Sequence, residues 1–168
     1  MKNNIINILF LVYCSLFIWN SSYACSCIGK ATTKQELKSS DFVFRGTVIE
    51  DSTFVIDTLF GDRYVYNTKY KFKVQSIYKG KKKHHEQEVV IITGIGNGDC
   101  GFRFEKGKEY IVYANWENKY YSKGEQVGKF LYTNICKRTT SDIETEEAEI
   151  EKYIKPCKWV LYLRVPSE

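Results

Sequence analysis

The stretch FVFRGTVI, residues 42–49, alternates apolar and other positions and is rich in aromatic and β-branched side chains. This composition and this period of two are typical of a β-strand. Outward from it, four more segments of the same character predict strands, at residues 63–78, 88–93, 108–116 and 129–136. Residues 57–62 predict the turn between the first two strands, and Gly107 and Gly128 precede the last two.

Helical patterns are confined to residues 32–39 and 142–154. Ser141 and Glu144 form a capping-box pattern at the start of the second, and Pro156 ends it. The carboxylates of this segment are interpreted as a solvated face. Five short strands with flanking helices predict a mainly β protein, a five-stranded OB-fold barrel, with a β-sandwich as the alternative. The apolar tail at residues 157–165 predicts a sixth strand or a docked segment.

The N-terminus has the pattern of a secretory signal peptide over residues 1–24. Lys2 precedes an apolar run at residues 5–19, and the small residues of Ser22-Tyr23-Ala24 predict cleavage after Ala24. A membrane anchor and a core helix are alternatives, although the run is short for a bilayer. A lipoprotein signal, with the lipid on Cys25, is another, although Ser22 stands where such signals usually carry Leu.

Cleavage would leave 144 residues (168 minus 24), enough for one domain, which we expect at residues 25–155 with a tail at 156–168. Losing Lys2 leaves 24 Lys and Arg against 20 Asp and Glu, a net charge of +4. This balance indicates solubility and no nucleic-acid partner. The six cysteines become five, so an exported chain would keep one without an internal partner. The five are Cys25, Cys27, Cys100, Cys136 and Cys157.

The remaining motifs predict no metal site, cofactor or enzyme. His84 and His85 are the two histidines of the chain, whereas a zinc site normally needs three or four protein ligands. The glycines of TGIGNGDCG, residues 93–101, lack the third glycine of a dinucleotide loop, so we interpret them as a turn that places Cys100. Cys25-Ser26-Cys27 could cycle as a dithiol, but distant cysteines in an exported chain favour structural disulfides.

Five motifs in order suggest a family: CSC at residue 25, FVFRGTV at 42, IYKG at 77, DCGF at 99 and TNIC at 133. Together they resemble the N-terminal domain of the tissue inhibitors of metalloproteinases and the wider netrin-like (NTR) module that shares its OB fold. The resemblance covers residues 25–153. It implies a barrel stapled by disulfides from Cys25 to Cys100 and from Cys27 to Cys136.

The resemblance also implies how such a protein acts. The free α-amino group and carbonyl of Cys25 would chelate the catalytic zinc of a protease, and Ser26 would enter the pocket beside that zinc. The expected protease-binding residues are Cys25, Ser26, Cys27, Ile28, Asn97, Gly98 and Asp99.

The expected protein is therefore a secreted inhibitor whose partner is a zinc metalloproteinase, with no cofactor and no membrane span. The periplasm or a lipid-anchored surface is the alternative location, and Cys157 is a candidate for a disulfide-linked dimer. The sequence departs from the family pattern at IGKATT, residues 28–33, and at Leu37, near the place of a further family cysteine. A non-inhibitory netrin-like binding or scaffold module is the alternative function.

Overall fold

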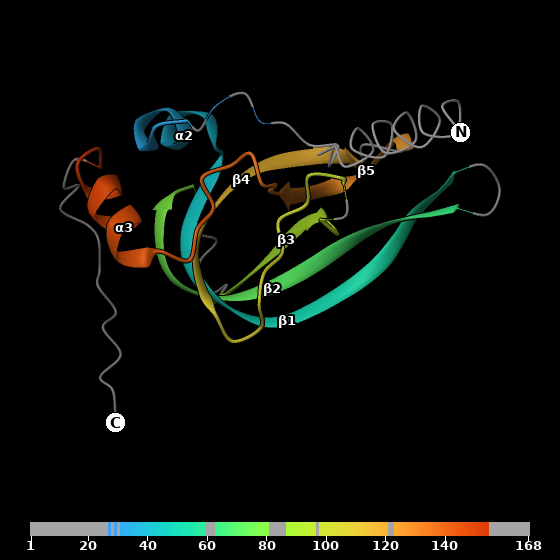
Figure 1. The fold of residues 1–168 in the computed structure, drawn as a ribbon, viewed down its shortest axis with the longest axis horizontal. Coiled ribbons are helices and arrows are strands. Elements are labelled where there is room, and N and C mark those ends of the chain that lie inside the picture. The colour runs from blue at the N-terminus through green and yellow to red at the C-terminus, as the bar shows by residue number, and fades with distance from the viewer. Residues whose placement is uncertain are drawn as a thin grey trace, which may run out of the picture.

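The computed structural model describes Cys27, Gly29 and residues 31–59, 63–80, 87–96, 98–120 and 123–154. These residues form five strands and two helices (Figure 1). In chain order the elements are α2 (Thr33–Ser39), β1 (Phe42–Leu59), β2 (Arg63–Lys79), β3 (Glu88–Gly94), β4 (Glu109–Tyr120), β5 (Lys123–Tyr132) and α3 (Ile143–Glu151).

The five strands close into a barrel in the order β1-β2-β3-β5-β4. All neighbouring strands are antiparallel except β3 and β5, which pair in parallel at Ile91 with Leu131 and at Ile92 with Tyr132. The prediction of a mainly β, five-stranded barrel is confirmed, and the sandwich alternative is wrong because the sheet closes on itself.

The boundaries differ from prediction where strand pairing extends beyond the local apolar pattern. Residues 57–59 belong to β1, because its ladder with β2 continues to the pair Leu59 and Arg63. The predicted turn at residues 57–62 is therefore wrong at its start. The sequence predicts the last strand at residues 129–136, whereas β5 lies at 123–132. Cys136 lies in a turn after this strand, where its N–H donates to Asn134 Oδ1.

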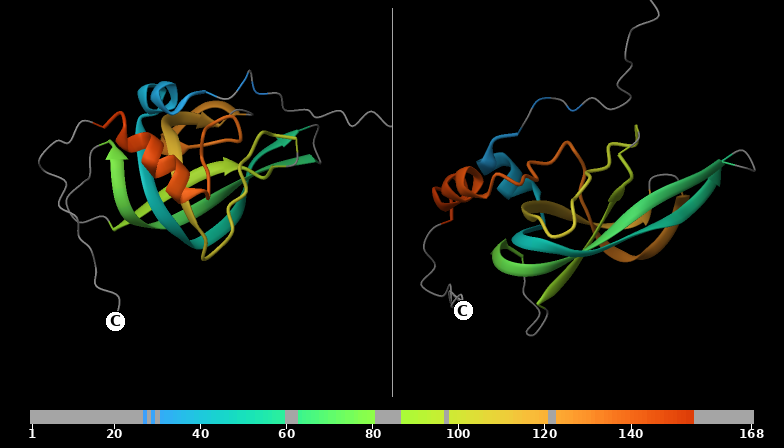
Figure 2. Two further views of the ribbon diagram at one scale, coloured as in Figure 1. Left: turned by 60° about the vertical axis from the view of Figure 1, so that its left-hand side comes forward. Right: turned by 60° about the horizontal axis from the view of Figure 1, so that its bottom comes forward.

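The long β1–β2 hairpin projects beyond the barrel (Figures 1 and 2). Its base is held by aromatic contacts with the β4–β5 hairpin. The ring of Phe54 lies 6.0 Å from that of Tyr120, which stacks on Phe130 at 4.9 Å. Farther out, Tyr64 is 58% exposed.

The barrel interior is filled by apolar side chains that alternate along the strands, as period-two patterning requires. Phe44 and Phe72 are fully buried and meet edge to face at 5.4 Å between ring centroids. Phe104, from the segment between β3 and β4, contacts the rings of Phe72 and Tyr110. The segment preceding β4 thus helps to fill the barrel.

A second, smaller core lies between the outer face of the barrel and the helices. Val43, Ile111, Tyr113 and Ile150 are its buried members, and Leu37 of α2 packs against it. Figure 2 shows α2 and α3 side by side against the barrel. Leu37, near the place where the resemblance implies a further cysteine, is thus an apolar contact of this core.

Both predicted helices are present, although α3 ends at Glu151 and not at residue 154, so the prediction that Pro156 ends it is wrong. Thr32 caps α2 and forms a capping box with Gln35. The cap of α3 is Asp142, whose side chain accepts from Thr145 N–H, so the prediction of Ser141 as the cap, with a capping box to Glu144, is wrong. None of the helices within the described part of the chain is long and apolar enough to cross a membrane. The tail at residues 157–165 lies outside the described residues.

Candidate functional site

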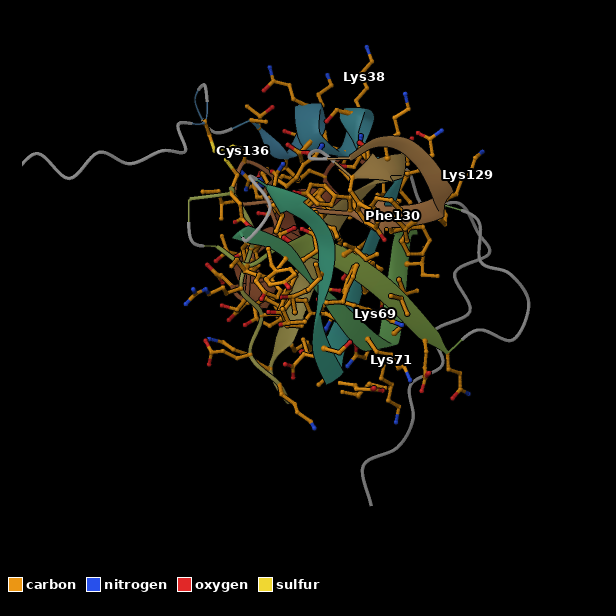
Figure 3. The ribbon with its side chains drawn as sticks, turned by 90° about the vertical axis from the view of Figure 1, so that its right-hand side faces the viewer. Lys38, Lys69, Lys71, Lys129, Phe130 and Cys136 are labelled. Carbon is orange, nitrogen blue, oxygen red and sulfur yellow. A yellow bond between two sulfur atoms is a disulfide. The ribbon has the colours of Figure 1, made fainter. Side chains whose placement is uncertain are left out.

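Cys27 is joined to Cys136 by a disulfide, with the two Cα atoms 5.3 Å apart. The bond links the segment before α2 to the turn after β5, and both residues are exposed (Figure 3 labels Cys136 at the periphery). It spans 109 positions of sequence, a cross-link that stabilises by about 5 kcal/mol on the chain-entropy account. This is the pairing that the resemblance implies for Cys27.

The loop after β3 is closed by the carboxylate of Asp99. Its Oδ2 accepts from Ile95 N–H at 2.7 Å, and its Oδ1 accepts from Gly96 N–H at 2.7 Å and from Gly101 N–H at 3.0 Å. Because these bonds turn the carboxylate toward the loop itself, Asp99 shapes the loop. Gly98 and Asp99 are both exposed on it.

Two glycines allow this loop to fold tightly. A Cβ on Gly101 would lie 2.1 Å from the carbonyl oxygen of Gly94, and a Cβ on Gly94 would lie 2.4 Å from Asp99 Oδ2. Between them, Cys100 has a φ of 58°, in the left-handed region that few residues other than glycine adopt. The TGIGNGDCG segment is therefore a strained turn that orients Cys100.

The Cys100 loop is bonded directly to the turn that carries Cys136. Ile135 N–H donates to the carbonyl oxygen of Cys100 at 2.9 Å. Thr133 N–H donates to Ile92 C=O at 3.2 Å, which continues the contact between these chain segments. Cys100 is itself disulfide-bonded. Its partner lies outside the described residues.

The structure thus gathers three of the predicted site residues. Cys27, through Cys136 and Ile135, is connected to the loop of Gly98 and Asp99. The other four lie outside the described residues, so the predicted bond from Cys25 to Cys100 stays a prediction. These four are Cys25, Ser26, Ile28 and Asn97.

The two residues that follow Cys136, Lys137 and Arg138, belong to a network of charged side chains that sequence patterns did not reveal. Arg138 donates through Nε at 2.9 Å and through Nη2 to the two carboxylate oxygens of Glu146, which is 4% exposed. Its Nη1 donates to Ala31 C=O at 3.1 Å. Lys137 pairs with Glu36, also 4% exposed, at 3.0 Å.

The interpretation of the α3 carboxylates as a solvated face is therefore wrong for Glu146. Its Oε1 also accepts from the phenol of Tyr113 at 2.6 Å. Burial and this bond raise the pKa of Tyr113 well above its usual range. The carboxylate likewise raises the pKa of Arg138, so both groups stay protonated donors. No signal in the sequence separates Glu146 from its exposed neighbours, because burial depends on which helix face meets the barrel.

The family model described as tissue inhibitor of metalloproteinase matches residues 23–158. The chain belongs to the tissue inhibitor of metalloproteinase family. Members of this family are extracellular proteins that inhibit enzymes and are not enzymes themselves. The matched residues include the barrel, both helices and the turn that the Cys27–Cys136 disulfide joins to the segment before α2.

This chain is similar to an NTR domain-containing protein of Margaritifera margaritifera. The two are 31% identical over 107 residues, which cover 62% of this chain and 66% of the relative. The alignment thus spans just under two thirds of the relative's length.

Among the described residues of this chain, no cluster of three or more His, Cys, Asp or Glu could hold a metal ion.

Proposed function

We propose that this protein is a secreted inhibitor of zinc metalloproteinases that binds the protease zinc through the α-amino nitrogen and carbonyl oxygen of Cys25. One observation carries the proposal: Cys27, two residues from Cys25, is fixed to Cys136 beside the loop that holds Cys100. The family supplies the class of partner.

The chemistry requires a neutral amine at the chain terminus. Signal-peptide cleavage after Ala24 would create that amine on Cys25. An α-amino group titrates near pH 8, so a useful fraction is neutral at physiological pH. A catalytic zinc keeps one coordination position for water or substrate, and the amine would take it. Ser26 would then point into the adjoining pocket, with Ile28 and the loop of Asn97, Gly98 and Asp99 alongside.

Rigidity makes this short segment an effective ligand. A free peptide would lose conformational entropy on entering a protease cleft, which opposes binding. The Cys27–Cys136 disulfide removes much of that freedom in advance. A second disulfide from Cys25 to Cys100, which we propose as the bond that Cys100 makes, would hold the chelating residue against the Asp99 loop.

The test begins with mass spectrometry of the secreted protein, to establish whether Cys25 is its first residue. A panel of secreted zinc proteases is then titrated with three forms: native, one with an alanine added ahead of Cys25, and one with an alanine added after Glu168. We expect inhibition by the native and C-terminally extended forms. The N-terminal extension converts the amine into an amide, which cannot donate a lone pair to zinc, and should abolish inhibition.

Two further results sharpen the conclusion. Ser26→Gly should weaken inhibition without abolishing it, since it removes a small pocket contact of about 1–2 kcal/mol. Equal inhibition by the native and N-terminally extended forms would refute chelation. If the native form inhibits none of the proteases, the alternative of a non-inhibitory netrin-like binding module takes precedence.

A further inference from the structure

The segment between Cys27 and α2 is held at two points by neighbouring residues of one turn. Cys136 holds Cys27 through the disulfide, and Arg138 donates from Nη1 to Ala31 C=O at 3.1 Å. Between these points Gly29 makes a turn in which its N–H donates to Cys27 C=O at 2.9 Å. Residues 136–138 therefore fix both ends of a five-residue segment.

Arg138 can act in this way because Glu146 sets its orientation. A guanidinium is planar, so two parallel bonds to one carboxylate fix the direction of its remaining N–H groups. Glu146 is in turn fixed by burial and by the Tyr113 phenol. The position of Ala31 is thus linked through Arg138 to α3.

A second arginine provides the same chemistry without that contact. Arg45 forms two bonds with Glu109, and its Nη1 donates to Glu147 of α3 at 3.1 Å. Glu147 accepts from the Tyr78 phenol at 2.6 Å, as Glu146 does from Tyr113. The two arginine side chains are similarly exposed, at 32% and 26%.

We propose that Arg138 is a positioning residue for protease inhibition, one that holds the N-terminal segment in its binding orientation through Ala31. This inference rests on the proposed function. Arg138 would act on the N-terminal segment and not on the protease zinc itself. Through Ala31 it restricts the chain that follows Cys27, and Cys27 carries the segment that would chelate the zinc.

The test compares Arg138→Lys with Arg45→Lys in the full secreted protein. A lysine keeps the positive charge and one bond to the carboxylate but cannot bond Glu146 twice and Ala31 together. Both variants should lose thermal stability, and Arg138→Lys more of it, because Glu146 is buried whereas Glu109 is partly exposed. Only Arg138→Lys should raise the inhibition constant, by about tenfold, as expected for one lost hydrogen bond from a charged group.

Two measurements are independent of inhibition: hydrogen exchange of peptides that span residues 27–35, and the rate at which dithiothreitol reduces the Cys27–Cys136 disulfide. We expect both to accelerate in Arg138→Lys and to stay at native values in Arg45→Lys. Equal changes in the two variants, or none in either, would overturn the proposal. If the segment loosens only in Arg138→Lys while the native protein inhibits no protease, the proposed function fails and the positioning of the segment by Arg138 stands.

Discussion

The backbone amide of Ile135 donates a hydrogen bond to the carbonyl oxygen of Cys100 at 2.9 Å. This bond puts Cys100 and Cys136, from opposite ends of the β4–β5 unit, on adjoining loops. Cys27 is bonded to the second of these loops. The segment that would reach the protease in the proposed function is thereby attached to the barrel through Cys27.

Non-reducing peptide mapping should find two disulfides, Cys27 with Cys136 and Cys25 with Cys100. The first is in the structure, and the second is the proposed bond of Cys100. Alkylation without reduction should label Cys157 unless it links two chains, in which case Cys157→Ser yields a monomer. A Cys25–Cys27 peptide, or Cys157 paired with Cys27, would contradict this pattern.

Gly101→Ala should destabilise the protein by about 1–3 kcal/mol, the usual cost of forcing atoms into a packed site. The added methyl group would lie 2.1 Å from Gly94 C=O, and a backbone cannot rotate away as a side chain can. Gly128→Ala is the control, because a Cβ there meets no atom within 4 Å. The measurement is urea unfolding of both variants. Equal midpoints would show that the close contact of Gly94 and Gly101 is not required.

Asp99→Ala should loosen the loop after β3, because three backbone N–H groups would lose their acceptor. Bonds to a charged group are worth about 1.5–3 kcal/mol each, although water replaces part of that at an exposed site. Hydrogen exchange at Gly96 and Gly101 should accelerate. Glu105→Ala, which removes an exposed carboxylate paired with Lys108, is the control. Unchanged exchange in Asp99→Ala would mean that the loop is held by its glycines alone.

Alkaline pH should destabilise the protein in part through Tyr113. Its pKa in the folded state is raised above the ordinary value of 10.0, by burial first and then by Glu146. Above pH 10 the folded state therefore binds more protons than the unfolded state, and stability falls as pH rises, by at most about 1.4 kcal/mol per pH unit for each such group. Below pH 10 the contribution is fully present.

Tyr113→Phe should cost about 1.5–3 kcal/mol at pH 8, where it removes a bond to a charged carboxylate, and less at pH 11. Its unfolding free energy should also depend less steeply on pH above 10, while Tyr78, whose pKa is raised by burial and Glu147, continues to titrate. Tyr64→Phe, at an exposed residue, is the control. Denaturant unfolding at a series of pH values measures this. Parallel curves for native and Tyr113→Phe would refute the assignment.

The sequence by itself predicted the order of the five strands and the presence of both helices. The alternation in residues 42–49 is a local property of the chain. Phe44 and Val48 lie on the same face of the strand and are both buried, which fixes the face that turns toward the barrel interior. The order of motifs also indicated the family and the partner of Cys27. Strand ends were less predictable, because the β1–β2 ladder continues through polar pairs such as Thr58 and Tyr64.

Only the tertiary structure decided which charged residues are buried and what they hold. Glu146 and its neighbours on α3 are alike in sequence, yet only the one that faces Tyr113 and Arg138 is excluded from water. Asp99 likewise closes its loop because the backbones of Gly94 and Gly101 lie close together. Such contacts join residues far apart in the chain, so they depend on barrel closure and helix packing, whereas periodic patterning depends on neighbours alone.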